Sequence, residues 1–131
     1  MWRGVLSTVV VLLSASFAHH TQAASLCPLL SKEAPMVGAL PDVCASETDA
    51  GTYVCEWRYA YRDAQADVDY TRLAEEMTAC GLKLVADAPV NHPDRSEAQV
   101  VTHDGLFFRL AIKDKSQLGA TLVFLERRPA R

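Results

Sequence analysis

Four polar side chains that are well suited to chemistry follow one another within five positions: Asn91, His92, Asp94 and Arg95. An imidazole, a carboxylate and a guanidinium this close together could line a polar pocket or bind a partner. The same composition is typical of an ordinary turn, because Asn and Asp bond their own backbone and proline fixes φ. We therefore take these four residues as a candidate binding site, and the interpretation as a simple turn stays open.

No catalytic residue is predicted, because the other residue types that do chemistry do not form a motif. The serines, among them Ser96 and Ser116, lack the Gly-x-Ser-x-Gly turn of many hydrolases. His103 ends a predicted strand, where a partly buried packing residue is the usual interpretation. The carboxylates of the predicted helix fall on or near its polar side and are typical of a solvated face. No glycine-rich phosphate loop occurs, so no cofactor is predicted.

All four cysteines, Cys27, Cys44, Cys55 and Cys80, lie beyond residue 23. Their spacing contains no Cys-x-x-Cys pair, so two disulfides are predicted in preference to a metal site. Cys55 falls on the apolar face of a predicted strand, and Cys80 on the apolar stripe of the helix that returns over it. This placement predicts a Cys55–Cys80 bond and leaves Cys27 to pair with Cys44. No thiol would then remain for nucleophilic catalysis.

The N-terminus has the order of a secretory signal peptide, with a cation at Arg3, an apolar run over residues 5–13 and small residues at 21–24. The apolar run is shorter than the roughly 20 residues of a membrane-spanning helix. We expect residues 1–23 to be cleaved, with cleavage after Ala24 as the competing position, and no stable membrane insertion afterwards. Residues 24–131 are expected to form a single small domain in the periplasm or outside the cell.

The charge balance narrows the class of partner. The chain has 13 basic and 16 acidic side chains and a formal net charge of −3. Removal of the signal would take Arg3 away, so the mature protein would be slightly more acidic. A modest acidic balance argues against nucleic acid or an anionic membrane as the partner.

Periodicity predicts an α+β fold in the order β-α-β-β-β-β, preceded by an irregular, disulfide-linked arm over residues 24–51. Residues 52–126 would form the core, an antiparallel or mixed sheet of about five strands with one helix packed on a face. The strands are expected at residues 52–62, 82–88, 98–103, 106–113 and 118–126, and the helix from Ala64 or Ala66 to Cys80. The pair Asp104-Gly105 suits a tight hairpin turn, whose register would pair His103 with Leu106, Val101 with Phe108 and Gln99 with Leu110.

The face of the sheet turned away from the helix is less polar than full exposure to water would favour. Val100, Phe107, Val123 and Leu125 are expected there. Two interpretations stay open. The N-terminal arm covers this face, which we favour, or the face binds another protein or a second copy of the chain.

Together these features predict a small exported protein that acts by binding, for example as an inhibitor or accessory factor of the envelope. Its partner is expected among envelope or extracellular proteins. Two alternatives stay open: a purely structural envelope component, and a small extracytoplasmic hydrolase that uses the Asn91–Asp94 loop, with His92 and Asp94 as acid and base. Convergence of His92, Asp94 and His103 in one concave pocket would favour the enzyme.

Overall fold

The computed structural model describes residues 26–31, 44–46 and 51–131. The expected signal peptide, at residues 1–23, and most of the expected arm, at residues 24–51, lie outside these residues. The described part has an α+β fold, as predicted, with one helix on a sheet whose strand pairs are all antiparallel.

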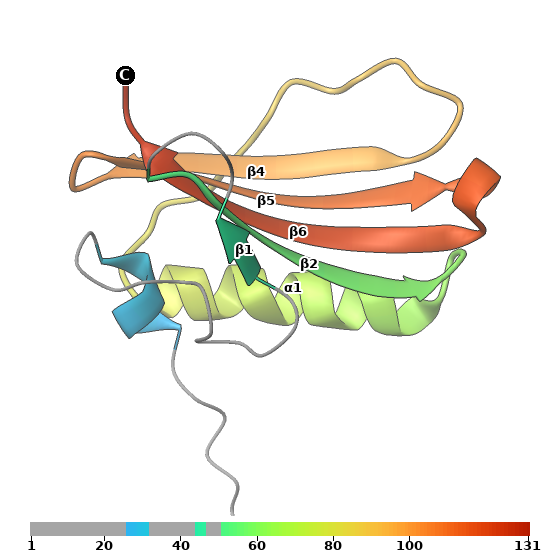
Figure 1. Cartoon of the computed structure of the whole chain (residues 1–131), viewed down its shortest axis with the longest axis horizontal. Helices are drawn as coiled ribbons and strands as arrows, with labels where there is room; N and C mark the ends of the chain where they lie inside the picture. The colour runs from blue at the N-terminus through green and yellow to red at the C-terminus, as the bar shows by residue number, and fades with distance from the viewer. Residues whose placement is uncertain (1–25, 32–43, 47–50) are drawn as a thin grey trace, which may run out of the picture.

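The sheet has six strands in the order β1-β2-β6-β5-β4-β3. The strands are β1 (Cys44–Ser46), β2 (Tyr53–Ala60), β3 (Val85–Ala86), β4 (Ser96–His103), β5 (Leu106–Lys115) and β6 (Ala120–Pro129). The helix is α1 (Ala64–Ala79), and two short 3-10 turns are η1 (Cys27–Leu30) and η2 (Ser116–Leu118). Helix α1 runs along one face of the sheet (Figure 1). The strand beyond the predicted five is β1, whose three residues are too few to show a periodicity.

The β4–β5 hairpin has the register that its turn sequence predicts. Asp104 and Gly105 both have positive φ, 56° and 73°, as a type I′ turn requires. The register pairs His103 with Leu106, Val101 with Phe108 and Gln99 with Leu110. As a result, alternate residues of β5, beginning at Leu106, face α1 and are buried.

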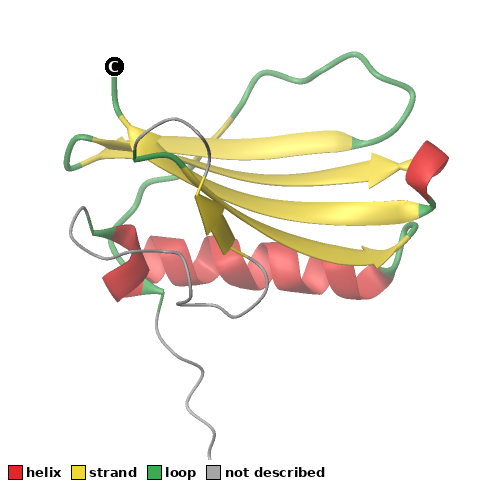
Figure 2. Ribbon diagram, in the orientation of Figure 1, coloured by secondary structure: helices red, strands yellow, loops and turns green. Residues whose placement is uncertain are grey.

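Helix α1 begins and ends at signals in its sequence. The side chain of Asp63 accepts a hydrogen bond from the backbone N–H of Gln65 at 2.9 Å, and Gly81, with a φ of +92°, follows the helix. The residues that α1 buries are Ala66, Leu73 and Met77. They pack on the central strands, where the fully buried apolar side chains are Phe108, Leu110, Ile112, Val123 and Leu125. Figure 2 shows α1 lying below the sheet.

The face opposite α1, which we call the open sheet face, differs in part from the prediction. Val100 and Phe107 lie on it, as expected. Val123 and Leu125 face α1 instead and are fully buried, so their predicted position is wrong. Residues 122–125 are all apolar, and no alternation reveals which way each side chain points. Phe124, between the two, takes the place on the open sheet face.

The described part of the arm packs on the α1 side of the sheet. Leu26 and Leu30, before and within η1, are buried in the same core as α1. Nη1 of Arg127, a residue that is 3% exposed, donates hydrogen bonds to the carbonyl oxygens of Leu29 and Ser31 at 2.9 and 2.6 Å. This guanidinium therefore attaches η1 to the end of β6. The expected covering of the open sheet face by the rest of the arm falls on residues outside the described ranges.

The two disulfides are Cys27–Cys80 and Cys44–Cys55, so the predicted pairing of Cys55 with Cys80 and of Cys27 with Cys44 is wrong. Strand β1 sets Cys44 directly opposite Cys55 in the antiparallel register, and this short strand was not visible in the sequence. Figure 1 shows η1 beside the C-terminal end of α1, and there Cys27 of η1 is bonded to Cys80, the residue that follows α1. Two disulfides indicate an oxidising, extracytoplasmic environment.

Removal of the Cys27–Cys80 bond is expected to destabilise the protein more than removal of the Cys44–Cys55 bond. The sequence separations are 53 and 11 residues, for which the chain-entropy estimate gives about 4 and about 3 kcal/mol. Urea unfolding of the double variants C27S/C80S and C44S/C55S beside the wild type measures the difference. A larger loss in C44S/C55S would contradict the expected order, and a proteolytic peptide that links Cys55 to Cys80 would contradict the pairing.

Candidate functional site

Three connections meet at one end of the sheet, on the right-hand side of Figure 1. They are the turn from β2 to α1 (residues 61–63), the loop before β4 (residues 90–95) and the turn through η2 between β5 and β6 (residues 116–119). We call these three segments the loop end. All four candidate binding residues lie in it: Asn91, His92, Asp94 and Arg95.

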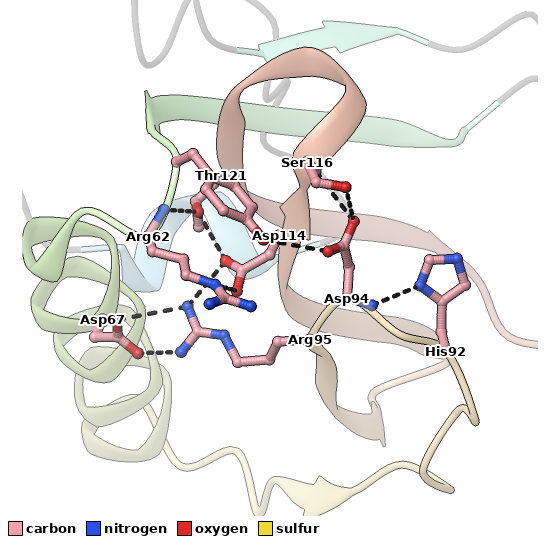
Figure 3. A network of polar contacts seen from close by, with 9 residues as sticks. Arg62, Asp67, His92, Asp94, Arg95, Asp114, Ser116 and Thr121 are labelled. Atoms are coloured by element: carbon pink, nitrogen blue, oxygen red, sulfur yellow. Dashed lines mark hydrogen bonds and ion pairs between the residues drawn. The ribbon is translucent and has the colours of Figure 1, made fainter.

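Asp94 holds the three connections together. Its Oδ2 accepts hydrogen bonds from the backbone N–H and the hydroxyl of Ser116 at 3.0 and 2.8 Å, and its Oδ1 accepts one from the Tyr61 hydroxyl at 3.3 Å (Figure 3). The two bonds from Ser116 are the main cause of a pKa of Asp94 below its ordinary value, and the Tyr61 bond and the nearby His92 add to this effect. Asp94 is thereby kept as a carboxylate that accepts from two other segments of the loop end.

His92 and Asn91 are exposed on the outer side of the same loop. Nδ1 of His92 accepts a hydrogen bond from the backbone N–H of Asp94 at 3.1 Å, which closes a small turn around Pro93. This contact agrees with the interpretation of the stretch as a turn. It also holds the exposed imidazole in one orientation, so the ring stays available to a partner.

A buried carboxylate, that of Asp114, lies behind the loop end on the α1 side of β5 and is only 4% exposed. Its Oδ1 accepts hydrogen bonds from Oγ1 of Thr121 at 2.7 Å and from Nη2 of Arg95 at 3.3 Å, and its Oδ2 lies 3.5 Å from Nε of Arg62 (Figure 3). Burial of an unpaired carboxylate is costly. Two guanidinium groups and a hydroxyl offset that cost here.

Arg95 joins this buried carboxylate to α1. Its Nη1 and Nη2 also donate to the two carboxylate oxygens of Asp67, at 2.5 and 3.5 Å. Figure 3 shows the Arg95 side chain directed toward Asp67 and Asp114, away from His92. The four candidates are thus divided: Asp94 and Arg95 hold the loop in place, and Asn91 and His92 face outward.

The surface of the loop end is hollowed where His92, Asp94 and Ser116 line a depression of about 440 Å³. These are the side-chain types of a hydrolytic triad, but their bonds differ from one. Ser116 donates its hydroxyl proton to the Asp94 carboxylate, and the imidazole of His92 accepts from a backbone N–H, so the histidine does not lie between the other two. His103 does not join them, because it lies at the other end of β4, roughly 23 Å along the strand from Ser96.

Sequence reasoning missed Asp114, Thr121 and Ser116 as parts of this site. A signal for Asp114 existed, because it continues the inward alternation of β5 by one further step. No comparable signal pointed to Ser116. Its bond to Asp94 joins positions that are 22 residues apart and meet only in the fold.

Asp114→Asn is expected to lower the free energy of unfolding by about 2–3 kcal/mol, because it leaves the charge of Arg95 without one of its two carboxylate partners in a partly buried place. Asp87→Asn is the matched control. Asp87 forms a surface pair with Arg109 at 3.6 Å, and its loss is expected to cost less than about 1 kcal/mol. Urea unfolding measures both, and equal losses would argue against a special role for Asp114.

Ser116→Ala is expected to raise the pKa of Asp94 part of the way to its ordinary value. The hydroxyl bond is lost, and the backbone N–H bond remains. Because the folded pKa of Asp94 is depressed, its contribution to stability is present above the unfolded pKa, about 3.9, and is lost as the pH falls through the folded pKa. A carboxyl-carbon NMR titration checks the change. Thr78→Ala removes a hydroxyl from α1 instead, and an equal shift in that variant would refute the assignment to Ser116.

Two further findings concern the described residues and the comparison of the sequence with known proteins. The described residues contain no helix that is long and apolar enough to cross a membrane, and no group of three or more His, Cys, Asp or Glu side chains placed to hold a metal ion. No protein-family model, no curated protein and no solved structure matches the chain. What bears on function is the arrangement of the loop end and of the open sheet face.

Proposed function

We propose that this protein is exported to the periplasm or the extracellular space and acts there by binding another protein through its loop end, as an inhibitor or accessory factor. The two disulfides support an oxidising destination. The signal-like sequence of residues 1–23 agrees with export. The binding role rests on the geometry of the loop end.

The observation that carries the binding role is that polar contacts hold the loop end from within while its outer surface stays exposed. Asp94 and Asp114 together connect all three segments. Leu118 and Val90 nevertheless have 56% and 57% of their surface exposed, and Leu118 lines the same depression as the exposed His92. Loops that are already ordered lose little conformational entropy on binding. Exposed apolar side chains supply contact area whose removal from water is favourable.

The hydrolase alternative would use the same depression but requires a rearrangement. Ser116 would have to turn from Asp94 to His92 before the imidazole could accept its proton. A binding role fits the contacts as they stand. A purely structural role is also compatible with them, and it differs from the binding role because it predicts no partner at Leu118.

A photo-crosslinking side chain at position 118 is expected to capture a partner of discrete mass when the full chain is exported by its native host. The same group at position 68 on α1 is the matched control, because Val68 is equally exposed (58%) and lies outside the loop end. Replacement of Asn91 and His92 by alanine is expected to lower the yield at position 118 at least about fivefold, since both side chains border the contact. Mass spectrometry of the products provides the readout.

Equal products from positions 118 and 68 would rule out the loop end as a specific binding site. A product at position 118 that is unchanged by the Asn91/His92 double substitution would remove the two outward-facing candidates from the interface. Ester hydrolysis by the purified protein that is lost in Ser116→Ala would favour the hydrolase instead.

A further inference from the structure

The open sheet face carries an excess of cations, although the whole chain has a formal net charge of −3. Strand pairing and alternation place five cations on this face: Arg58, Arg109, Lys113, Lys115 and Arg128. Three carboxylates lie there as well: Glu56 and Glu126 by the strand pairing, and Asp87, which forms an ion pair with Arg109. The other side is acidic, because α1 carries four carboxylates and one arginine. The charge of the described residues is therefore divided between the two sides of the sheet.

The cation at the centre of this excess is Lys113. Its neighbour Arg109 lies 3.6 Å from the carboxylate of Asp87, whereas Lys113 has no carboxylate partner among the described residues. Its ammonium instead lies 5.9 Å from the centre of the Phe124 ring. Partial burial, together with the nearby charges of Arg109 and Lys115, lowers the pKa of Lys113. An anion brought to this point would relieve that repulsion.

A small hollow is present at the same place. It has a volume of about 110 Å³ and is lined by Lys113, Arg109 and Phe124 and also by the carboxylate residue Glu126 and by Val54 and Ala111. Nε of Arg109 is buried and has no hydrogen-bond acceptor in the described part of the chain. Two cations beside an aromatic ring suit a carboxylate on an apolar stem, because the charge can pair with the cations while the stem contacts the ring.

We propose that the open sheet face binds an acidic segment of another protein, with a carboxylate between Lys113 and Arg109 and a neighbouring apolar side chain against Phe124. The charge of the face attracts such a segment, and the acidic side of α1 repels it, so the approach is oriented. The hollow beside Lys113 is distinct from the depression at the loop end, although Lys115 of this face lines that depression. The proposal therefore goes beyond the proposed function and does not require it.

A discrete carboxylate suits this face better than a row of phosphates does. Glu56 and Glu126 lie among the cations, and Nε of Arg128 is already 3.2 Å from Glu126. A membrane surface or a nucleic acid would bring phosphates close to these carboxylates, and like charges repel. A polypeptide can present hydrogen-bond donors to them and an acid to Lys113.

An NMR titration of the oxidised full chain tests the proposal with two blocked hexapeptides: one alternates glutamate with phenylalanine, and its analogue has glutamine in place of glutamate. The acidic peptide is expected to shift the signals of Lys113, Arg109 and Phe124. Lys113→Glu is expected to weaken its binding roughly tenfold, and Lys113→Gln by less. Lys83→Glu is the matched control, because Lys83 is exposed and lies outside the sheet, and it is expected to leave the affinity unchanged.

Several outcomes would overturn the proposal. They are equal weakening by Lys113→Glu and Lys83→Glu, equal affinity for the glutamine analogue, and no shift at millimolar peptide. Tighter binding of phosphatidylglycerol vesicles or of a single-stranded oligonucleotide at Lys113 would assign the face to a membrane or a nucleic acid instead. Nuclear Overhauser contacts between residues 32–43 and Phe124 would show that the arm of the same chain covers the open sheet face. Concentration-dependent broadening at Phe124 would show that a second copy of the chain binds there. If no partner is crosslinked at position 118 while the acidic peptide still binds, the proposed binding role of the loop end fails and the proposal for the open sheet face stands.

Discussion

The buried carboxylate of Asp114 organises the end of the molecule that bears its exposed loops. Thr121 donates to it from β6, Arg62 approaches it from the β2–α1 turn, and Arg95 reaches it from the loop before β4. The backbone N–H of Arg62 also donates to the Thr121 hydroxyl at 2.8 Å, which closes the network. A buried charge without partners is destabilising. The folded state therefore needs β6, the β2–α1 turn and the loop before β4 to be in contact with Asp114 at the same time. One desolvation penalty thus sets the position of the loops that face outward.

The opposite end of the sheet is held by different chemistry. There the Cys27–Cys80 and Cys44–Cys55 bonds attach η1 and β1, and the buried guanidinium of Arg127 binds the carbonyl oxygens of η1. Because η1 and β1 are short, they form few backbone hydrogen bonds, and the disulfides provide the stability that longer elements would gain from such bonds. The disulfide-linked end therefore depends on an oxidising compartment, whereas the loop end depends on the hydrogen bonds and ion pairs of Asp94 and Asp114.

The features that the sequence predicted are those with local signals. The extent of α1, the Asp104-Gly105 turn and the apolar stripe of the helix each follow from neighbouring residues, and the structure agrees with each prediction. The cysteine pairing could not be obtained in this way, because it depends on β1, a strand of three residues. At the site, composition located the loop but not the direction of its side chains. Asp94 and Arg95 are adjacent, yet they bind Ser116 and Asp114 respectively, and those contacts exist only in the tertiary structure.

The open sheet face follows from the small size of the fold, since a single helix covers only one face of the sheet and the other must suit water or a partner. Two aromatic rings lie on it, and each has a cation over it. The guanidinium of Arg128 lies 4.2 Å from the centre of the Phe107 ring, and the ammonium of Lys113 lies 5.9 Å from that of Phe124. The apolar stems of these cations cover part of the rings. When a carboxylate draws the cation to itself, the ring beneath becomes available to an apolar neighbour. The two cation–ring pairs thus make the open sheet face compatible with water, and they favour a negatively charged segment in the proposed complex.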